Sequence, residues 1–384
     1  MSDSSRVQLA GLEEVTWGVT PASPLASIRY TTENLGHRIE NSRSDEVRAD
    51  GQTTDIVPVG SNVDGGFDFE ASHGAHDIYM EGQLRSDFTA DSSFSAATVD
   101  AAAADNSFND SGSGFPTLAA GQWIRVAGFS TNPVNNGWHE VVSQVAGKIV
   151  VAGVTLITEA VGDTITISDS TLVNGVVKKS YTLEKNMNDV TQFFGFTGCR
   201  VNTWSLVLAS RQKVTGTFGV LGKAGALAAT TLGSGAYTAA PTNLILNASA
   251  NVARLFEGGA VLGAGVFAQT INIDFNQNLR VVDGIGQPDA VDIGLGRFNT
   301  TGTLDALFAN EVLFNKYMNS TESAINVAIE DAAGNGYMVS FPAVVYTNGD
   351  IVGVGNDDQI IASMEWEAKM HATQGIMARI DRTP

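Results

Sequence analysis

The sequence predicts a mainly β protein that is internally duplicated and carries a small all-β insertion. The 384-residue chain contains 41 glycines and 43% hydrophobic residues but only 16% charged ones, a composition typical of strands joined by tight turns. Short segments of alternating apolar and polar residues recur along the chain. Two long regions share one order of such segments, and about 90 residues interrupt the first of them.

The first region opens with a predicted strand at residues 27–32, followed by a polar and charged stretch at 33–65. Strict apolar–polar alternation over 66–71 then predicts a half-buried strand. Apolar residues at near-helical spacing predict a helix within 75–87.

The second region repeats this order. A predicted strand at 269–275 precedes a polar, Gly- and Asp-rich stretch at 276–299. A strand at 301–308 and an amphipathic helix at 310–318 follow. Later strands of the two regions correspond in the same order: 180–184 with 325–330, 199–209 with 342–354, and 215–223 with 362–370.

We therefore predict two copies of one fold, an insertion and a connector. Their bounds are 1–91 plus 176–223 for the first copy, 92–175 for the insertion, 224–268 for an Ala/Gly-rich connecting arm, and 269–384 for the second copy. The insertion is expected to begin with a solvated connector at 91–114 and to continue as four or five short strands within 122–168. The connecting arm is either a flexible linker or a packed arm, and its apolar residues around Leu244 and Leu246 favour the packed arm.

The charge balance bears on possible partners. The formal net charge is −19, with 41 acidic and 22 basic residues, and residues 1–91 alone hold 16 acidic and six basic ones. A protein that grips nucleic acid by neutralising phosphates needs a basic face, which this composition argues against. Nucleic acid that passes without adhering is compatible with it. No apolar run is long enough to predict a membrane span, and no signal peptide is expected.

Catalytic and metal-binding motifs are not evident in the sequence. Cys199 is the only cysteine and lies on an alternating apolar segment, so we predict a buried thiol and no disulfide. His73 and His76 stand three apart beside Asp77, so a metal site is imaginable, but the polar start of a surface helix explains them equally well. We therefore expect no enzyme activity, no cofactor and no metal.

Acidic residues on predicted strands are the most unusual feature. They alternate with apolar residues, and the six candidates are Asp68, Glu70, Asp274, Asp305, Glu365 and Glu367. One interpretation is a solvated sheet face. The sharper hypothesis is the wall of a channel that repels a polyanion.

Four segments resemble the tail tube proteins of bacteriophages with long, non-contractile tails, and the likeness covers about residues 11–91 and 176–370. They are Glu13-Glu-Val-Thr-Trp-Gly-Val-Thr-Pro21, Ser44-Asp-Glu-Val-Arg-Ala-Asp-Gly-Gln-Thr-Thr-Asp55, Phe194-Gly-Phe-Thr-Gly-Cys-Arg-Val-Asn-Thr-Trp-Ser-Leu206 and Gly294-Leu-Gly-Arg-Phe-Asn-Thr-Thr-Gly-Thr-Leu304. The insertion departs from the family pattern.

The resemblance implies a structural virion protein with a β-sandwich or barrel tail-tube fold and flanking helices. Such subunits form stacked rings whose inner sheets join into a channel for the phage DNA. The polar stretch at 33–65 is expected to stack one ring on the next, and its candidate residues are Arg38, Arg43, Asp45, Glu46, Arg48 and Asp50. Two folds per chain predict a homotrimer with pseudo-sixfold symmetry, with a homohexamer as the alternative.

Further partners implied by the resemblance are the tape measure protein and the tail terminator and tip proteins. Assembly in the host cytoplasm and residence in the virion tail are implied as well, with no membrane partner. The insertion is expected to project from the outside of the tube. Its tryptophans suggest an alternative function for the chain, a β-rich adhesin or carbohydrate-binding surface module.

Overall fold

A computed structural model describes residues 3–249, 251–262, 266–353, 355–356 and 358–383. In these residues 27 strands form an 18-stranded, a seven-stranded and a two-stranded sheet, and two α-helices flank the largest one. The mainly β prediction is therefore confirmed. None of the described helices is both long enough and apolar enough to cross a membrane.

The elements fall into three groups. The first half contains η1 (Ser4–Arg6), β1 (Val7–Glu13), β2 (Ala26–Ser27), β3 (Thr32–Glu33), β4 (Gly36–Arg43), β5 (Ile56–Glu70), α1 (Asp77–Leu84), β13 (Thr171–Val173), β14 (Tyr181–Met187), β15 (Gln192–Ala209), β16 (Thr215–Gly222) and β17 (Ala224–Ala228). The insertion contains β6 (Ser92–Ala96), β7 (Val99–Ala102), β8 (Ser107–Asp110), β9 (Trp123–Ala127), η2 (Pro133–Asn135), β10 (Gly137–Val145), β11 (Lys148–Ala152) and β12 (Ile165–Asp169). The second half contains β18 (Val252–Glu257), β19 (Ala260–Val261), β20 (Ala268–Asn276), β21 (Arg280–Val282), β22 (Asp292–Gly294), β23 (Asn299–Leu307), α2 (Val312–Met318), β24 (Ser323–Glu330), β25 (Gly336–Val352), β26 (Ile361–Ala368) and β27 (Arg379–Arg382).

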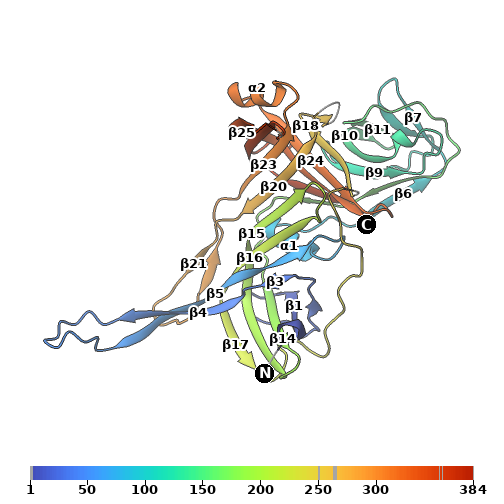
Figure 1. Cartoon of the computed structure of the whole chain (residues 1–384). Helices are drawn as coiled ribbons and strands as arrows, with labels where there is room; N and C mark the ends of the chain where they lie inside the picture. Colours follow the sequence, from blue (N-terminus) through green and yellow to red (C-terminus); the bar gives the residue numbers. More distant parts are fainter. Residues whose placement is uncertain (1–2, 250, 263–265, 354, 357, 384) are drawn as a thin grey trace.

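The two halves repeat one antiparallel pairing order. In the first half the order is β4-β5-β16-β15-β14-β1, and in the second it is β20-β23-β26-β25-β24-β18. The halves are joined where Thr203–Ala209 of β15 pairs with Asn276–Thr270 of β20, so one sheet runs through both (Figure 1).

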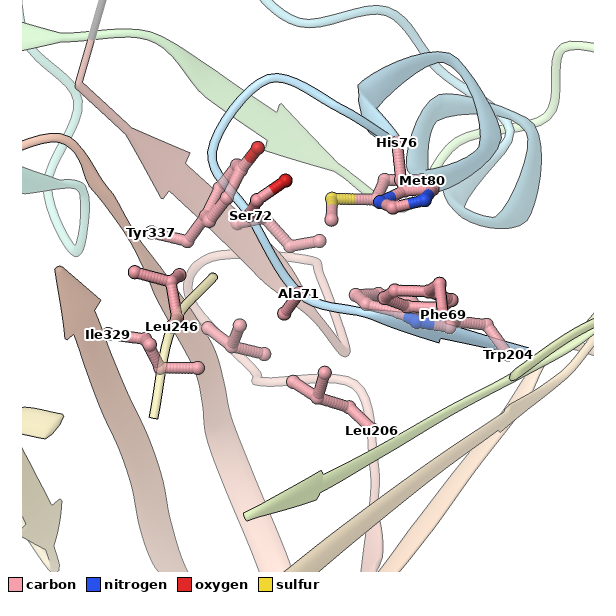
Figure 2. Close-up of a pocket in the computed structure, with 12 residues that line it drawn as sticks. Phe69, Ala71, Ser72, His76, Met80, Trp204, Leu206, Leu246, Ile329 and Tyr337 are labelled. Carbon is pink, nitrogen blue, oxygen red and sulfur yellow. The ribbon is translucent and has the colours of Figure 1, made fainter. Parts of the chain in front are cut away.

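The core of this sheet is aromatic. The rings of Trp204 and Phe275 stack across the β15–β20 junction with their centroids 4.7 Å apart, and Phe218 stacks on the other side of Trp204. Cys199 is fully buried, as predicted, and burial raises the pKa of its thiol. A cavity of about 20 Å³ lies in the core beside Trp204, as Figure 2 shows.

The histidines near α1 are buried, so their interpretation as a polar surface helix start is wrong. The Nε2 atom of His73 lies 3.1 Å from the Thr383 carbonyl oxygen, and that of His76 lies 2.8 Å from the Arg29 carbonyl oxygen. Burial lowers the pKa of His76 to about 4, so this ring is neutral at pH 7.

The start of the insertion also differs from the expectation. Residues 91–114 are not a solvated connector, because they hold β6, β7 and β8. Val99 and Phe108 from this stretch are buried in the insertion's own core with Ile124 and Ile165. The seven strands are arranged β6-β12-β9-β10-β11-β8-β7, and the next strand, β13, already pairs with β27 of the large sheet.

The connector between the halves is packed at several points. The buried carboxylate of Glu184 accepts hydrogen bonds from the Leu232 backbone N–H (2.6 Å) and the Tyr237 hydroxyl (2.5 Å). Further along, Leu246 is 1% exposed, whereas its neighbour Leu244 is 74% exposed. The connector therefore follows the surface of its own chain and inserts single side chains into it.

Candidate channel and assembly surfaces

The six candidate carboxylates lie on one face of the large sheet. Directly opposite residues of antiparallel strands point to the same side. One cross-strand row runs Asp68, Thr217, Ser205, Asp274, Thr301, Glu367. The next parallel row runs Glu70, Thr215, Val207, Asn272, Thr303, Glu365, and Asp305 pairs with Ser363 in the row beyond it.

The opposite face of the same strands is the aromatic core. Alternation places Phe67, Trp204, Phe275 and Trp366 there, each 1% exposed. The sheet is thus polar and acidic on one side and apolar on the other. Because the register carries every row across both halves, the acidic side is continuous across the β15–β20 junction.

Few cations offset these carboxylates. The Lys213 ammonium lies 2.5 Å from Glu70, but it is 61% exposed, so solvent screens the pair. Asp68 accepts hydrogen bonds from the Thr217 hydroxyl (2.6 Å) and from Thr32, and Asp305 accepts one from Ser363 at 2.6 Å. Burial raises the pKa of Asp274. The rest of these rows is mostly hydroxyl and amide side chains, so the face is polar and its charged residues are mainly acidic.

Residues 33–65 form a hairpin arm rather than the loop expected from their charges. We call residues 36–64 the β4–β5 arm, and it extends away from the body of the molecule in Figure 1. Arg38 lies in the paired part and contacts Asp64 through its Nε at 2.5 Å, while Arg43 ends β4. The other predicted residues, Asp45, Glu46, Arg48 and Asp50, lie in the exposed tip.

The arm carries exposed apolar side chains that the sequence analysis did not single out. Ile39, Ile56, Val57 and Val59 are 45–59% exposed. These β-branched residues occur in two segments on either side of a polar tip, a pattern from which the sequence could have predicted a hairpin. The β21–β22 hairpin of the second half supports the arm's base, where the Ser61 N–H donates to the Pro288 carbonyl oxygen at 2.8 Å. A groove of about 420 Å³ lies between the two hairpins.

One strand edge is open in the second half and closed in the first. The C-terminal part of β15 is paired on both sides, by β16 and by β20. The equivalent part of β25, residues 346–352, pairs with β26 on one side, and no described strand covers the other. Asn348 and Asp350 on this edge are exposed. An uncovered edge is a template for another strand.

The insertion is docked firmly on the second half. Trp123 and Trp138 pack with Phe256, Ala328 and Met338 in a buried cluster. This side-chain packing joins the insertion to the second half in addition to its chain connections to the first half. The tryptophans that suggested a carbohydrate-binding module are 2% and 0% exposed, so neither is available to a sugar ring.

Polar contacts surround this apolar cluster. Glu330 Oε2 accepts hydrogen bonds from the Trp138 indole N–H and the Arg125 guanidinium, both at 3.0 Å. The Trp123 backbone N–H donates to Asp381 at 3.2 Å. Burial raises the pKa of Asp381 to about 8, and the nearby Asp169 adds to this while Arg379 opposes it.

The described residues contain no group of three or more His, Cys, Asp or Glu side chains arranged to hold a metal ion. No curated protein matches the chain. Residues 4–368 match the family model of the phage tail tube protein, which covers nearly the whole chain. The chain therefore belongs to the phage tail tube protein family, whose members are structural components of the virion tail and not enzymes.

Proposed function

We propose that three copies of this chain close into a ring and that the rings stack into the tube of a long non-contractile tail. The acidic sheet face would line the channel through which the DNA genome leaves. The observation that carries the proposal is the alignment of Asp68, Asp274 and Glu367 in one cross-strand row on the polar face of a sheet that spans both halves.

The acidic face suits transit of DNA. Duplex DNA carries one negative charge per about 1.7 Å of its axis, so a carboxylate-lined wall repels it and offers no phosphate-binding site. Screening at physiological salt reduces this repulsion over about 8 Å, which leaves it effective only close to the wall. A wall with this property guides the duplex and does not retain it.

The closed edge of the first half supplies a template for ring closure. Thr203 of β15 pairs with Asn276 of β20. When the registers of the two halves are aligned, Asn348 of β25 is equivalent to Thr203 of β15, and Arg38 of β4 is equivalent to Asn276 of β20. Transferring the register pairs Asn348 with Arg38 of a second copy, Asp350 with its Gly36, and Val352 with its Asn34.

This contact is heterologous, so repetition with a fixed rotation closes a ring. Each chain contributes two equivalent sheet halves, and three chains therefore supply six. A channel that admits duplex DNA yet guides it favours six halves over twelve. A homohexamer is the alternative. The tape measure protein and the terminator and tip proteins are the further partners we propose, with assembly in the host cytoplasm.

Native mass spectrometry and negative-stain microscopy of the purified chain test the proposal. We expect rings of three chains and tubes built from them. A count of six chains per ring would exclude the trimer, and a monomer at every concentration would exclude tube formation by this chain alone. Ile351→Pro removes a backbone donor from the open edge, where the Ile351 N–H donates to the Asp350 side chain at 2.8 Å, and it should abolish rings. Val142→Pro at an exposed position of the insertion should spare them.

A further inference from the structure

The two halves differ at one end of their cores. In the first half the end beyond β5 and β16 is closed by Leu246 of the connector, whose N–H donates to the Ala71 carbonyl oxygen at 2.8 Å. The Val214 N–H in turn donates to the Leu246 carbonyl oxygen at 3.0 Å. Figure 2 shows Leu246 beside Ala71 and Leu206 at this point. The segment is extended and forms short bridges on both sides of Leu246.

The second half repeats this end without the cap. Phe308 donates its N–H to the Ile360 carbonyl oxygen at 2.9 Å, as Ala71 does to Val214 at 2.8 Å. Among the described residues no extended segment takes the place of Leu246 there.

At three pairs of equivalent positions the side chain is buried in the first half and exposed in the second. Ala71, Leu206 and Val214 are 9%, 4% and 0% exposed in the first half. Their counterparts Phe308, Ile351 and Ile360 are 37%, 38% and 51% exposed.

Val312 at the start of α2 adds a fourth exposed side chain, at 53%. These four residues, Phe308, Val312, Ile351 and Ile360, are named the open core end. Exposed large apolar side chains at an uncapped core end are typical of a protein contact.

We propose that the open core end is the docking site for the β4–β5 arm of a second copy in the adjacent ring. The inference rests on the proposed tube function and names the contact that stacks the rings. The occupant must be extended and apolar, because the segment that closes the first half is an extended strand carrying a leucine. The arm meets both requirements with Ile39, Ile56, Val57 and Val59.

The placement of the two surfaces supports this occupant. The arm leaves the β5 end at Ile56, whereas the open core end lies at the far end of the equivalent strand β23, beyond Leu307. Figure 1 accordingly shows the arm and α2 well separated, with the arm at the lower left and α2 at the top. Stacking in one direction brings the arm end of one ring against the opposite end of the next.

The test uses two full-length double variants. Val312→Asp with Ile360→Ser alters the open core end, and Val57→Asp with Val59→Asp alters the arm. Val312 begins α2, where an acidic residue is favourable, so this change should spare the fold. Val145→Asp, at a 65% exposed position of the insertion, is the matched control.

We expect both double variants to form rings by native mass spectrometry but no tubes by microscopy, while Val145→Asp forms tubes like the wild type. Mixing the two variants leaves one intact arm facing one intact open core end, so discrete double rings should appear. Tubes from the Val312→Asp, Ile360→Ser variant would overturn the docking site, and so would loss of its rings or absence of double rings in the mixture. Failure of the wild-type chain to form rings would instead reject the proposed function.

Discussion

The insertion and the β4–β5 arm both leave the first half of the chain, yet they are stabilised in opposite ways. The insertion buries its own core around Phe108 and Ile124 and is fixed to the second half by Trp123 and Trp138. The arm has two strands, exposed apolar side chains and no core of its own. An isolated two-stranded hairpin is marginally stable in water. The insertion is therefore stabilised by burial within its own subunit, whereas the apolar side chains of the arm are left exposed in the single chain.

Removing the arm tests this contrast most severely. Replacing residues 41–58 with a two-residue Asn-Gly turn keeps Arg38 and Ser61, which lie near the body. We expect ring formation to persist and tube formation to be lost completely, as judged by native mass spectrometry and microscopy. Long tubes from this variant would mean that another contact stacks the rings.

Truncating a docking tryptophan measures the other side of the contrast. Trp138 is fully buried and donates to Glu330, so Trp138→Ala should lower the free energy of unfolding by about 3–5 kcal/mol. Val142→Ala on the same strand, at 51% exposure, is the control and should change it little. Urea denaturation gives both values, and a Trp138→Ala loss no larger than the control's would contradict firm docking.

Deleting the insertion separates its stability role from assembly. The cut should remove residues 92–169 and stop before β13, which belongs to the large sheet. With a short Gly/Ser joint we expect tubes to form, at a lower melting temperature because Phe256 and Met338 become exposed. Loss of rings in a protein that still melts cooperatively would show that the insertion takes part in ring contacts.

The buried Asp381 beneath the insertion should make stability pH-dependent. Its pKa is raised to about 8 in the folded chain from 3.8, so the folded state holds the extra proton between these values. The stability from this group is therefore present below about pH 4 and is lost as the pH rises toward 8. The slope is at most about 1.4 kcal/mol per pH unit. Melting curves from pH 5 to 9 should be flatter for Asp381→Asn, and equal slopes would refute this assignment.

The smallest effect is expected at the arm's tip. Arg48 contacts Asp50 at 2.8 Å, and this pair lowers the pKa of Asp50, but both side chains are more than 40% exposed. Exposed pairs are screened by solvent and salt. Arg48→Ala should leave the melting temperature and tube length unchanged, and a clear loss of tubes would place Arg48 inside a stacking contact.

The sequence predicted correctly those features that depend on the residue pattern within a single strand. Alternation predicted that Asp68 lies on one face of its strand and that Phe67 and Phe69 lie on the other, and the structure agrees. It could not show that Asp68, Asp274 and Glu367 share a face, because cross-strand register is set by contacts between segments distant in the chain. The sequence could not show that Trp138 is buried for a similar reason, since its partners Phe256, Ala328 and Met338 are more than 100 positions away. The three strands in the Ser- and Ala-rich stretch at 91–114 were not predicted, because this stretch has few large apolar residues and no clear alternation.

The β15–β20 junction within one chain has a consequence for assembly kinetics. Covalent linkage gives its two edges a high effective concentration, so this seam forms during folding whatever the protein concentration. In a ring of three chains, half of the seams would then exist before any subunits meet. Ring formation would depend on the third power of subunit concentration and not the sixth, so rings could nucleate early in an infection while the protein is still scarce.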